Sequence, residues 1–282
     1  MTKNAKVWLI IGASLFIIGV LVFAVAMTLN GWDFRKLSTV KYERETYKIA
    51  DDFNSVVLKT DTADIKILPS EDESCSVICY EETNAKHSVC VKDGVLNITL
   101  QNQKKWYEYI GINFDSTKLT VYLPKSEYDA LSIMASTSDV EIAKNFDFHS
   151  VDISVSTGDI NIENITTHTL DITVSTGDIT LDSVNCQSLI SRGSTGDITL
   201  KDTVAQLDLF IKRSTGDIRL ERSDAATIYI KTDTGDITGT VLEDRHFDVV
   251  TNTGDVRVPK EGKGGNCQII TNTGDILIDI AK

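Results

Sequence analysis

Apolar and polar side chains alternate along most of this chain, and from about residue 131 the alternation repeats with a fixed period. In nearly every repeat, apolar residues stand eight and six positions before an aspartate and one and three positions after it. Such period-two alternation is typical of β-strands that bury one face. Each repeat therefore predicts two strands, with a turn at the aspartate between them.

The turn carries a short phrase, Ser, Asp or Asn followed by Thr-Gly-Asp and then Ile or Val, that occurs seven times. An eroded copy, Ser-Thr-Ser-Asp-Val, precedes it and ends at Val140. Successive aspartates are 19 or 20 residues apart, which is the regularity of a solenoid in which each repeat forms one coil. Glycine permits the positive φ that a tight turn needs. The expected turn ladder consists of Asp139, Gly158, Asp159, Gly177, Asp178, Gly196, Asp197, Gly216, Asp217, Gly235, Asp236, Gly254, Asp255, Gly274 and Asp275.

Coils stacked about 4.8 Å apart would hold these carboxylates in a row, where neighbours repel by roughly 0.9 kcal/mol in water. Hydrogen bonds from turn N–H groups and from the Thr hydroxyls of neighbouring coils would offset this repulsion. A row of bound calcium ions is the alternative, but one carboxylate per coil supplies few of the oxygens that calcium needs. We therefore favour hydrogen bonding and expect neither a metal nor another cofactor.

These patterns predict an all-β protein whose residues 131–282 form a parallel β-solenoid of about eight coils of 19–20 residues. Residues 49–130 alternate without a fixed period and predict an irregular β cap at the N-terminal end of the stack. The segment Asp-Thr-Ala-Asp-Ile at residues 61–65 echoes the turn phrase, so we expect the cap to pack on the first coil. Little sequence follows Ile280, so Ile276 and Ile278 are expected to lie at an exposed edge.

Residues 7–29 form 23 consecutive positions without a charged side chain, enough for a helix to cross about 30 Å of hydrocarbon. We expect a cytoplasmic tail at 1–6, a transmembrane anchor in the lipid bilayer at 7–29 and a juxtamembrane stalk at 30–48. The remainder would then lie outside the cytoplasm, as the C-terminal domain of a single-pass protein of the cell membrane. The alternative is a signal peptide cleaved near Ala26, but the apolar stretch is longer than signal peptides usually have.

The chain is acidic, with a net charge of −13. Four Lys or Arg and one Asp give residues 1–36 a charge of +3, so residues 37–282 carry −16. Nucleic-acid binding needs clustered basic residues to neutralise phosphates. A nucleic-acid partner is therefore not expected.

The cysteines and two of the histidines could bind a metal or form a disulfide, but their spacing gives little indication of either. The five cysteines, Cys75, Cys79, Cys90, Cys186 and Cys267, lack the CxxC spacing of zinc sites. Cys79 and Cys90 could form a disulfide across a hairpin at residues 84–85. The interpretation that we favour is that they are small buried hydrophobic residues.

His149 and His168 stand ten positions before successive aspartates. They could form a metal-binding pair, but we favour the interpretation that they are two polar loop residues.

No nucleophile elbow, phosphate-binding loop or dinucleotide fingerprint is present. The sequence therefore predicts a protein that is not an enzyme. Polysaccharide lyases also use parallel β-helices, which keeps a glycan-active enzyme as an alternative, but a shared fold does not assign a function.

One outward-facing stretch is not acidic. In the third to fifth repeats, apolar and aromatic residues lie beside basic ones, and the predicted binding face is Ile190, Arg192, Phe210, Lys212, Arg213, Tyr229 and Lys231. Aromatic and basic residues are frequent at recognition surfaces, which indicates a site for an anionic envelope ligand or an unknown partner protein. The alternative is ordinary packing between neighbouring strands, with the basic groups relieving the aspartate row.

The N-terminal anchor, the segment Leu-Thr-Val-Tyr-Leu-Pro at residues 119–124 and the serial Ser-Thr-Gly-Asp-Ile units occur together in this chain. This combination resembles the putative-adhesin β-strand-repeat family of bacterial envelope proteins, a family of unknown function, over residues 50–282. The resemblance implies a right-handed parallel β-solenoid at the cell surface, with adhesion assigned by analogy and some relatives linked to sensing of envelope stress. Ser138, which stands where the family has Gly, weakens only the first turn.

We therefore expect a non-catalytic, membrane-anchored, adhesin-like interaction module on the outer side of the cell membrane. A sensor or regulator of envelope stress that acts with a membrane partner is the second interpretation. A glycan-active enzyme is the third.

Overall fold

The computed structural model describes residues 3–34, 40–106, 115–260, 262 and 264–281. The chain divides into two compact units. Met1–Tyr42 and Gln103–Asp115 make up the first, and Glu43–Asn102 and Ser116–Lys282 make up the second.

Helix α1 (Lys3–Leu29) belongs to the first unit and includes the apolar segment 7–29. Within the described residues it is the one helix long and apolar enough to cross a membrane, over Asn4–Leu29. The 26 residues of this candidate span correspond to roughly 39 Å at about 1.5 Å per residue. This length exceeds the hydrocarbon thickness of a typical bilayer.

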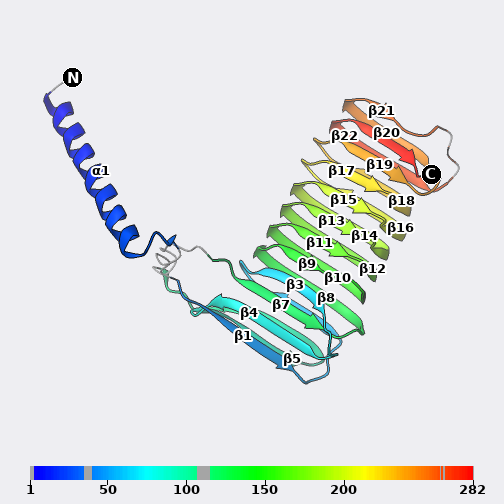
Figure 1. Cartoon of the computed structure of the whole chain (residues 1–282). Helices are drawn as coiled ribbons and strands as arrows, with labels where there is room; N and C mark the ends of the chain where they lie inside the picture. Colours follow the sequence, from blue (N-terminus) through cyan, green and yellow to red (C-terminus); the bar gives the residue numbers. More distant parts are fainter. Residues whose placement is uncertain (1–2, 35–39, 107–114, 261, 263, 282) are drawn as a thin grey trace. The chain divides into compact units, whose positions relative to one another are not determined.

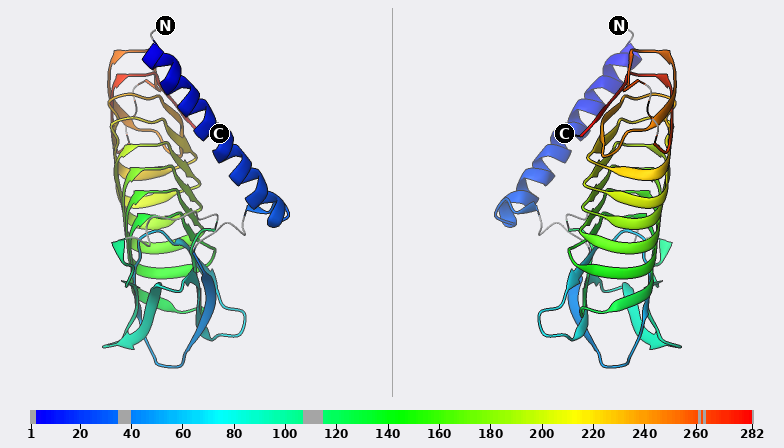
Figure 2. Two further views of the ribbon diagram at one scale, coloured as in Figure 1. Left: turned by 90° about the vertical axis from the view of Figure 1, so that its left-hand side faces the viewer. Right: turned by 90° about the vertical axis from the view of Figure 1, so that its right-hand side faces the viewer.

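The second unit is built from coils, each consisting of a longer strand, a corner at the Thr-Gly-Asp phrase and a shorter strand. The longer strands are β8 (Glu127–Thr137), β10 (Phe146–Thr157), β12 (Ile165–Thr176), β14 (Asn185–Thr195), β16 (Val204–Lys212), β18 (Asp224–Lys231), β20 (His246–Thr253) and β22 (Asn266–Thr273). The shorter strands are β9 (Val140–Ile142), β11 (Ile160–Glu163), β13 (Ile179–Asp182), β15 (Ile198–Lys201), β17 (Ile218–Glu221), β19 (Ile237–Val241), β21 (Val256–Arg257) and β23 (Ile276–Ile280). These elements make about seven complete turns, stacked along one axis (Figures 1 and 2).

Neighbouring coils pair in parallel and in register, long strand with long strand and short strand with short strand. β10 pairs with β8 on one side and with β12 on the other, so Ile153 lies between Ile133 and Ile172. This register places equivalent positions of the repeat side by side along the stack. The predicted parallel β-solenoid is confirmed.

The core lies inside the coils, where the apolar columns of the sequence pattern meet. Leu170 and Ile172, eight and six positions before an aspartate, are at most 1% exposed. Within β10, the successive buried residues Phe148 and Val151 are three positions apart instead of two. The alternation of buried and exposed side chains is therefore shifted by one residue between them. A one-residue shift turns a strand's buried side around, and the longer strand therefore bends at this point.

The Thr-Gly-Asp corners lie directly on one another. Their glycines have φ between 129° and 147°, a range that residues with a side chain rarely adopt. Except at Gly254 in the outermost coil, the N–H of each corner glycine donates to the carbonyl of the neighbouring corner threonine, as in Gly158 to Thr176 at 3.0 Å. A Cβ on Gly177 would lie 2.0 Å from the carbonyl oxygen of Gly158. The glycine is therefore needed both for its φ and for the close approach of the coils.

The corner aspartates form a continuous ladder of hydrogen bonds. The Oδ1 of each aspartate accepts the backbone N–H of the aspartate in the next coil, at 2.7–2.9 Å. The order along the ladder is Asp139, Asp159, Asp178, Asp197, Asp217, Asp236, Asp275 and Asp255. These bonds confirm the expected role of the turn N–H groups. The Thr hydroxyls, expected as a second set of donors, make no such bond within the described residues.

The last two coils are reversed in space relative to the sequence. β18 pairs with β22, which pairs in turn with β20, and the shorter strands follow the same order. The C-terminal coil therefore lies inside the stack, where Ile276 and Ile278 are fully buried. The expectation of an exposed edge at these residues was wrong. The outermost coil is β20–β21, in which Val250 and Val256 are 49% and 46% exposed.

A buried ion pair holds the connection that makes this reversal possible. Arg245 Nη2 lies 2.5 Å from Asp224 Oδ1. Asp224 Oδ2 also accepts the N–H groups of Leu242 and Glu243, which fixes the β19–β20 connection beside β18. The chain returning to β22 crosses at the same place, where a Cβ on Gly262 would lie 1.6 Å from the Arg245 carbonyl oxygen. The ion pair and the glycine together accommodate the crossing of the two connections.

The cap comprises the remaining strands, β1 (Tyr42–Ile49), β2 (Ser55–Lys59), β3 (Asp64–Pro69), β4 (Cys75–Glu82), β5 (Ala85–Lys92), β6 (Val95–Asn102) and β7 (Lys118–Leu123). β2 and β3 form a coil that pairs in parallel with β8 and β9. Ile65, in the segment that echoes the turn phrase, pairs with Val140 and donates its N–H to Asp139 O at 2.8 Å. The predicted packing of the cap on the first coil is confirmed.

The far side of the cap changes from parallel to antiparallel pairing. β6 and β7 pair in parallel with β2 and β3, and then β5 pairs antiparallel with β6 and β4 antiparallel with β7. β4 meets β5 only at Glu82 and Ala85, so these strands continue one another around a corner and do not form a hairpin. β1 pairs with β4 and begins at Tyr42, inside the range expected for the stalk. The antiparallel strands end the parallel stack at this side.

Replacing Gly177 by Ala should destabilise the solenoid by roughly 2–4 kcal/mol, because the new methyl group meets the neighbouring backbone and the φ is unfavourable. Denaturant unfolding followed by circular dichroism measures this loss. The matched control is Ser175→Ala at an exposed position of the same coil, which should change stability by less than about 0.5 kcal/mol. Equal stability of the two variants would contradict the stacked-corner geometry.

The ladder predicts different effects for two changes at Asp217. Asp217→Asn keeps an oxygen that accepts the N–H of Asp236 and removes a charge from the row, so stability should stay within about 0.5 kcal/mol of wild type or rise. Asp217→Ala removes the acceptor and should cost roughly 1–2 kcal/mol. Urea unfolding of both variants tests this. Both variants lack the charge, so an equal loss of stability in Asn and Ala would show that the charge, rather than the hydrogen bond, matters at the corner.

Candidate functional site

The predicted binding face is assembled by the parallel register of β14, β16 and β18. Ile190 pairs with Phe210, and Phe210 pairs with Tyr229. The rings of Phe210 and Tyr229 are stacked, with centroids 5.0 Å apart and planes inclined by 9°. Arg192 places its guanidinium carbon 5.5 Å from the centre of the Phe210 ring, within the range of a cation–π contact. Residues from three repeats thus form one continuous surface.

Basic residues line this surface in the neighbouring column. Arg192, Lys212 and Lys231 lie side by side in register. Arg192 is paired with Asp171, with Nη1 at 3.2 Å from both carboxylate oxygens. Lys212 and Lys231 have no acidic partner among the described residues. We call Ile190, Arg192, Phe210, Lys212, Tyr229 and Lys231 the aromatic-basic face.

The basic residues on the shorter strands of the same coils are already paired. Lys201 lies 2.6 Å from Asp182, Arg219 2.6 Å from Glu221, and Arg222, just after β17, 2.5 Å from Asp202. Lys212 and Lys231 therefore differ from these neighbours in carrying positive charge that no side chain of the described residues neutralises.

The reversed order of the last two coils also shapes this face. Tyr229 pairs with Gln268, and Lys231 pairs with Ile270. In sequence order the neighbours would have been Asp248 and Val250. The inserted coil thus separates the carboxylate of Asp248 from the aromatic pair by one strand, which keeps this end of the face free of negative charge.

Arg213, expected on the same face, is instead buried inside the solenoid, and that part of the prediction was wrong. It is 1% exposed, and its Nη1 donates to the carbonyl of Val174 at 2.9 Å. Its Nε and Nη2 have no hydrogen-bond partner. Burial lowers the pKa of Arg213 to about 10, while the nearby carboxylate of Asp178 acts in the opposite direction.

The space for this arginine comes from the neighbouring coil. Gly193 stands at the equivalent position, four before the motif aspartate, where the two preceding coils have Val155 and Val174. A Cβ on Gly193 would lie 1.7 Å from Arg213 Nη1. Continued two positions beyond the column that stands six before the aspartate, the alternation places this position in the interior. A glycine beside an arginine in one inward column was therefore the signal that the sequence offered.

The structure also brings together a polar cluster in the cap that the sequence did not single out. Cys79 and Glu81 alternate on β4, and His87 lies on β5 beyond the corner that joins the two strands. One ligand atom from each of the three lies within 4.8 Å of the others, and all three residues are buried. Glu81 Oε2 accepts the backbone N–H of His87 at 2.8 Å and lies 2.6 Å from its Nδ1. Among the described residues, no other group of three such side chains is this close.

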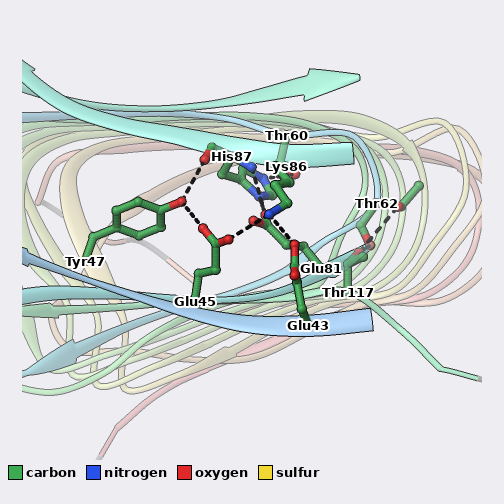
Figure 3. A network of polar contacts seen from close by, with 9 residues as sticks. All are labelled: Glu43, Glu45, Tyr47, Thr60, Thr62, Glu81, Lys86, His87 and Thr117. Carbon is green, nitrogen blue, oxygen red and sulfur yellow. Dashed lines mark hydrogen bonds and ion pairs between the residues drawn. The ribbon is translucent and has the colours of Figure 1, made fainter. Parts of the chain in front are cut away.

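Figure 3 shows that hydrogen bonds from β1 and from the turn after β2 reach His87 of this cluster. His87 Nε2 lies 2.9 Å from Thr60 Oγ1, and the Tyr47 hydroxyl donates to the His87 carbonyl at 3.3 Å and to Glu45 at 2.5 Å. Lys86 pairs with Glu45 at 2.7 Å and also with Glu43. The one lysine of this network therefore faces Glu43 and Glu45 and makes no ion pair with Glu81.

Burial dominates the protonation of the cluster's thiol. It raises the pKa of Cys79 to about 12, with smaller contributions in the same direction from Glu81 and Glu45. Burial, together with the hydrogen bond to Glu45, also raises the pKa of Tyr47. Cys79 is therefore a neutral thiol at physiological pH unless a cation replaces its proton.

The five cysteines are all free, so the disulfide alternative for Cys79 and Cys90 was wrong. Cys79 pairs with Leu119 and is buried, whereas Cys90 pairs with Asn97 and is exposed, because β4 and β5 do not form a hairpin.

His149 and His168 lie on the adjacent strands β10 and β12, at exposed positions with ring centroids 4.3 Å apart. The expectation that they are loop residues was therefore wrong.

Two replacements test the burial of Arg213. Arg213→Met fills the same space without a buried charge and should leave stability unchanged or raise it by about 1 kcal/mol. Arg213→Ala leaves a cavity beside Gly193 and should cost roughly 2–3 kcal/mol. Denaturant unfolding measures both, with Lys212→Ala at the exposed neighbour as the control. Effects of Arg213→Ala as small as those of the control would place this side chain on the surface.

A family model, Toastrack DUF4097, matches residues 53–263. Among solved structures, this chain is similar to a putative adhesin from Bacteroides fragilis, with 18% identity and a TM-score of 0.52 over 85% of this chain and 97% of that one. It is also similar to a protein described as a putative lipid binding protein from Parabacteroides distasonis, with 15% identity and a TM-score of 0.52 over 86% of this chain and 98% of that one. At these identities the likeness shows a shared fold. No curated protein matches the chain.

The matched region begins in the cap, before β2, and extends past the corner at Gly254, so it includes both the cap cluster and the aromatic-basic face. Because the family model covers well over half of the sequence, the chain belongs to the Toastrack DUF4097 family.

Proposed function

We propose that this protein is a non-catalytic interaction module, tethered to the cell membrane by α1 and exposed outside the cytoplasm. We further propose that its aromatic-basic face binds an anionic component of the cell envelope. The length and apolar character of α1 support the tether. The names of the structural neighbours, a putative adhesin and a putative lipid binding protein, are in line with a surface role of this kind.

The observation that carries the proposal is the pair Lys212 and Lys231 beside the stacked rings of Phe210 and Tyr229. The unit around them is strongly acidic, since residues 37–282 carry a net charge of −16. Two adjacent lysines without an acidic partner therefore concentrate positive charge at one place on an acidic unit. Each cation contributes about 1 kcal/mol of attraction toward an anionic surface.

The stacked rings add a second mode of recognition to this charge. Phe210 and Tyr229 are half-buried and present a rigid surface with few rotatable bonds. A ligand that carries regularly spaced negative charge could follow the lysine column while an uncharged part of it packs on the rings. Linear phosphodiester polymers of the cell envelope have this chemistry.

The test uses the full chain in neutral detergent and a soluble fluorescent poly(glycerol phosphate), with binding measured by anisotropy. Lys212→Gln/Lys231→Gln should weaken binding by roughly thirtyfold, since two contacts of about 1 kcal/mol are lost. Adding Phe210→Ala should abolish binding. Lys201→Gln, on the other side of the same coils and paired with Asp182, should change binding by less than about twofold.

Unchanged affinity in the double variant would remove the aromatic-basic face from the proposal. An equal loss in Lys201→Gln would reveal attraction to charge in general, without a defined face. Both glutamine variants replace exposed or half-exposed side chains, so their unfolding midpoints should equal that of the wild type and serve as the folding control.

A further inference from the structure

The cluster of Cys79, Glu81 and His87 contains three of the side-chain types that bind transition metals in proteins: thiol, carboxylate and imidazole. Cys79 and Glu81 are two residues apart on β4 and therefore point to the same, inner side of the strand. His87 reaches them from β5, because the chain turns only at the corner between Glu82 and Ala85. The result is a convergent set of ligand atoms within 4.8 Å of one another, inside the cap.

A second observation also points to cation binding. Glu81 is fully buried, and its Oε1 has no hydrogen-bond partner, although Oε2 has two. Leaving a buried carboxylate oxygen without a partner is costly, and native proteins rarely do so. Lys86 does not supply the charge, because its ammonium group is held by Glu43 and Glu45. The interior thus offers a buried carboxylate oxygen, Glu81 Oε1, that no hydrogen bond satisfies, beside the imidazole of His87.

We propose that Cys79, Glu81 and His87 form a binding site for a divalent transition metal of the zinc class. A thiolate, a carboxylate and a neutral imidazole together carry two negative charges, so a dication would make the buried group neutral. Sulfur, nitrogen and oxygen ligands are the set that zinc accepts in tetrahedral sites. A fourth position would remain for a water molecule.

The geometry requires only a small rearrangement. In a tetrahedral site two ligands that are each about 2.0 Å from zinc lie roughly 3.3 Å apart. His87 Nδ1 and Glu81 Oε2 are now 2.6 Å apart, joined by a hydrogen bond. The metal would take the place of the proton in this bond, that proton would pass to Nε2 of the neutral His87 ring, and the Cys79 thiol would release its proton to solvent. His87 Nε2 would keep its contact with Thr60, which fixes the orientation of the ring.

Such a metal would crosslink β4 to β5 at the corner between them, in the antiparallel part of the cap. These strands share only one residue pair, so little else joins them directly. The site therefore has a structural role in the proposal, and it is independent of ligand binding at the aromatic-basic face.

The first experiment titrates the reduced full-length protein, purified in neutral detergent, with Co²⁺ as a spectroscopic probe for zinc. We expect one equivalent to bind with a thiolate-to-cobalt charge-transfer band in the near ultraviolet, and zinc to remove this band. Cys79→Ser should lose the band. Cys90→Ser, on the exposed cysteine of β5, should keep it. Absence of the band in the wild type, or its persistence in Cys79→Ser, would overturn the proposal.

The second experiment uses Glu81→Gln, which preserves shape and removes the charge. We expect zinc affinity to fall by at least tenfold, while far-ultraviolet circular dichroism without metal stays as in the wild type. Zinc should raise the unfolding midpoint of the wild type and of Cys90→Ser, but not that of Glu81→Gln.

The exposed pair His149 and His168 could also attract zinc, and His149→Gln is the control for it. An unchanged band and midpoint shift in that variant support the site in the cap. Loss of the shift in His149→Gln, with no effect of Glu81→Gln, would place the metal at the histidine pair and refute the proposal.

Discussion

The whole second unit depends on how closely one Thr-Gly-Asp corner can lie on the next. At each corner the backbone N–H groups and carbonyls continue the parallel ladder around the turn, and the aspartate closes it by accepting the N–H of its neighbour. The glycine makes this approach possible, because any side chain there would overlap the adjacent carbonyl, as at Gly196 and Gly216. A row of like charges is tolerated because each carboxylate is used as a hydrogen-bond acceptor. The constant repeat length follows from this constraint.

Because every coil offers the same ladder to its neighbours, the ladder itself does not dictate the order in which coils stack. At the C-terminal end, β22–β23 lies between β18–β19 and β20–β21, and at the other end β2–β3 lies between β8–β9 and β6–β7. Features outside the repeat determine the order in which the coils stack. Near the C-terminus these are the Arg245–Asp224 ion pair and the glycine at the crossing, and in the cap it is the change to antiparallel pairing.

The stack also explains why sites arise where the repeat is broken. Equivalent positions become neighbours, so a few unusual residues in successive repeats, such as Phe210 and Tyr229, merge into one surface. A glycine in one coil makes room for the buried Arg213 of the next. In the cap, where no repeat enforces an apolar interior, a thiol, a carboxylate and an imidazole meet inside the fold.

The sequence by itself determined the parallel solenoid, its corners and its inward columns, because period-two alternation locked to a recurring glycine turn admits few other arrangements. It also located the aromatic-basic face, since columns follow from the period. Only the tertiary structure decided the order of the last coils, the burial of Arg213 and the meeting of Cys79, Glu81 and His87. The order of the coils depends on which strands pair with each other, and the repeat pattern of the sequence fits several of these pairings equally well. Spacing along the chain places Gly193 and Arg213 in one column, but only the packed structure shows that the glycine leaves the space that the arginine fills. The cluster in the cap depends on a corner between strands, which spacing along the chain does not reveal.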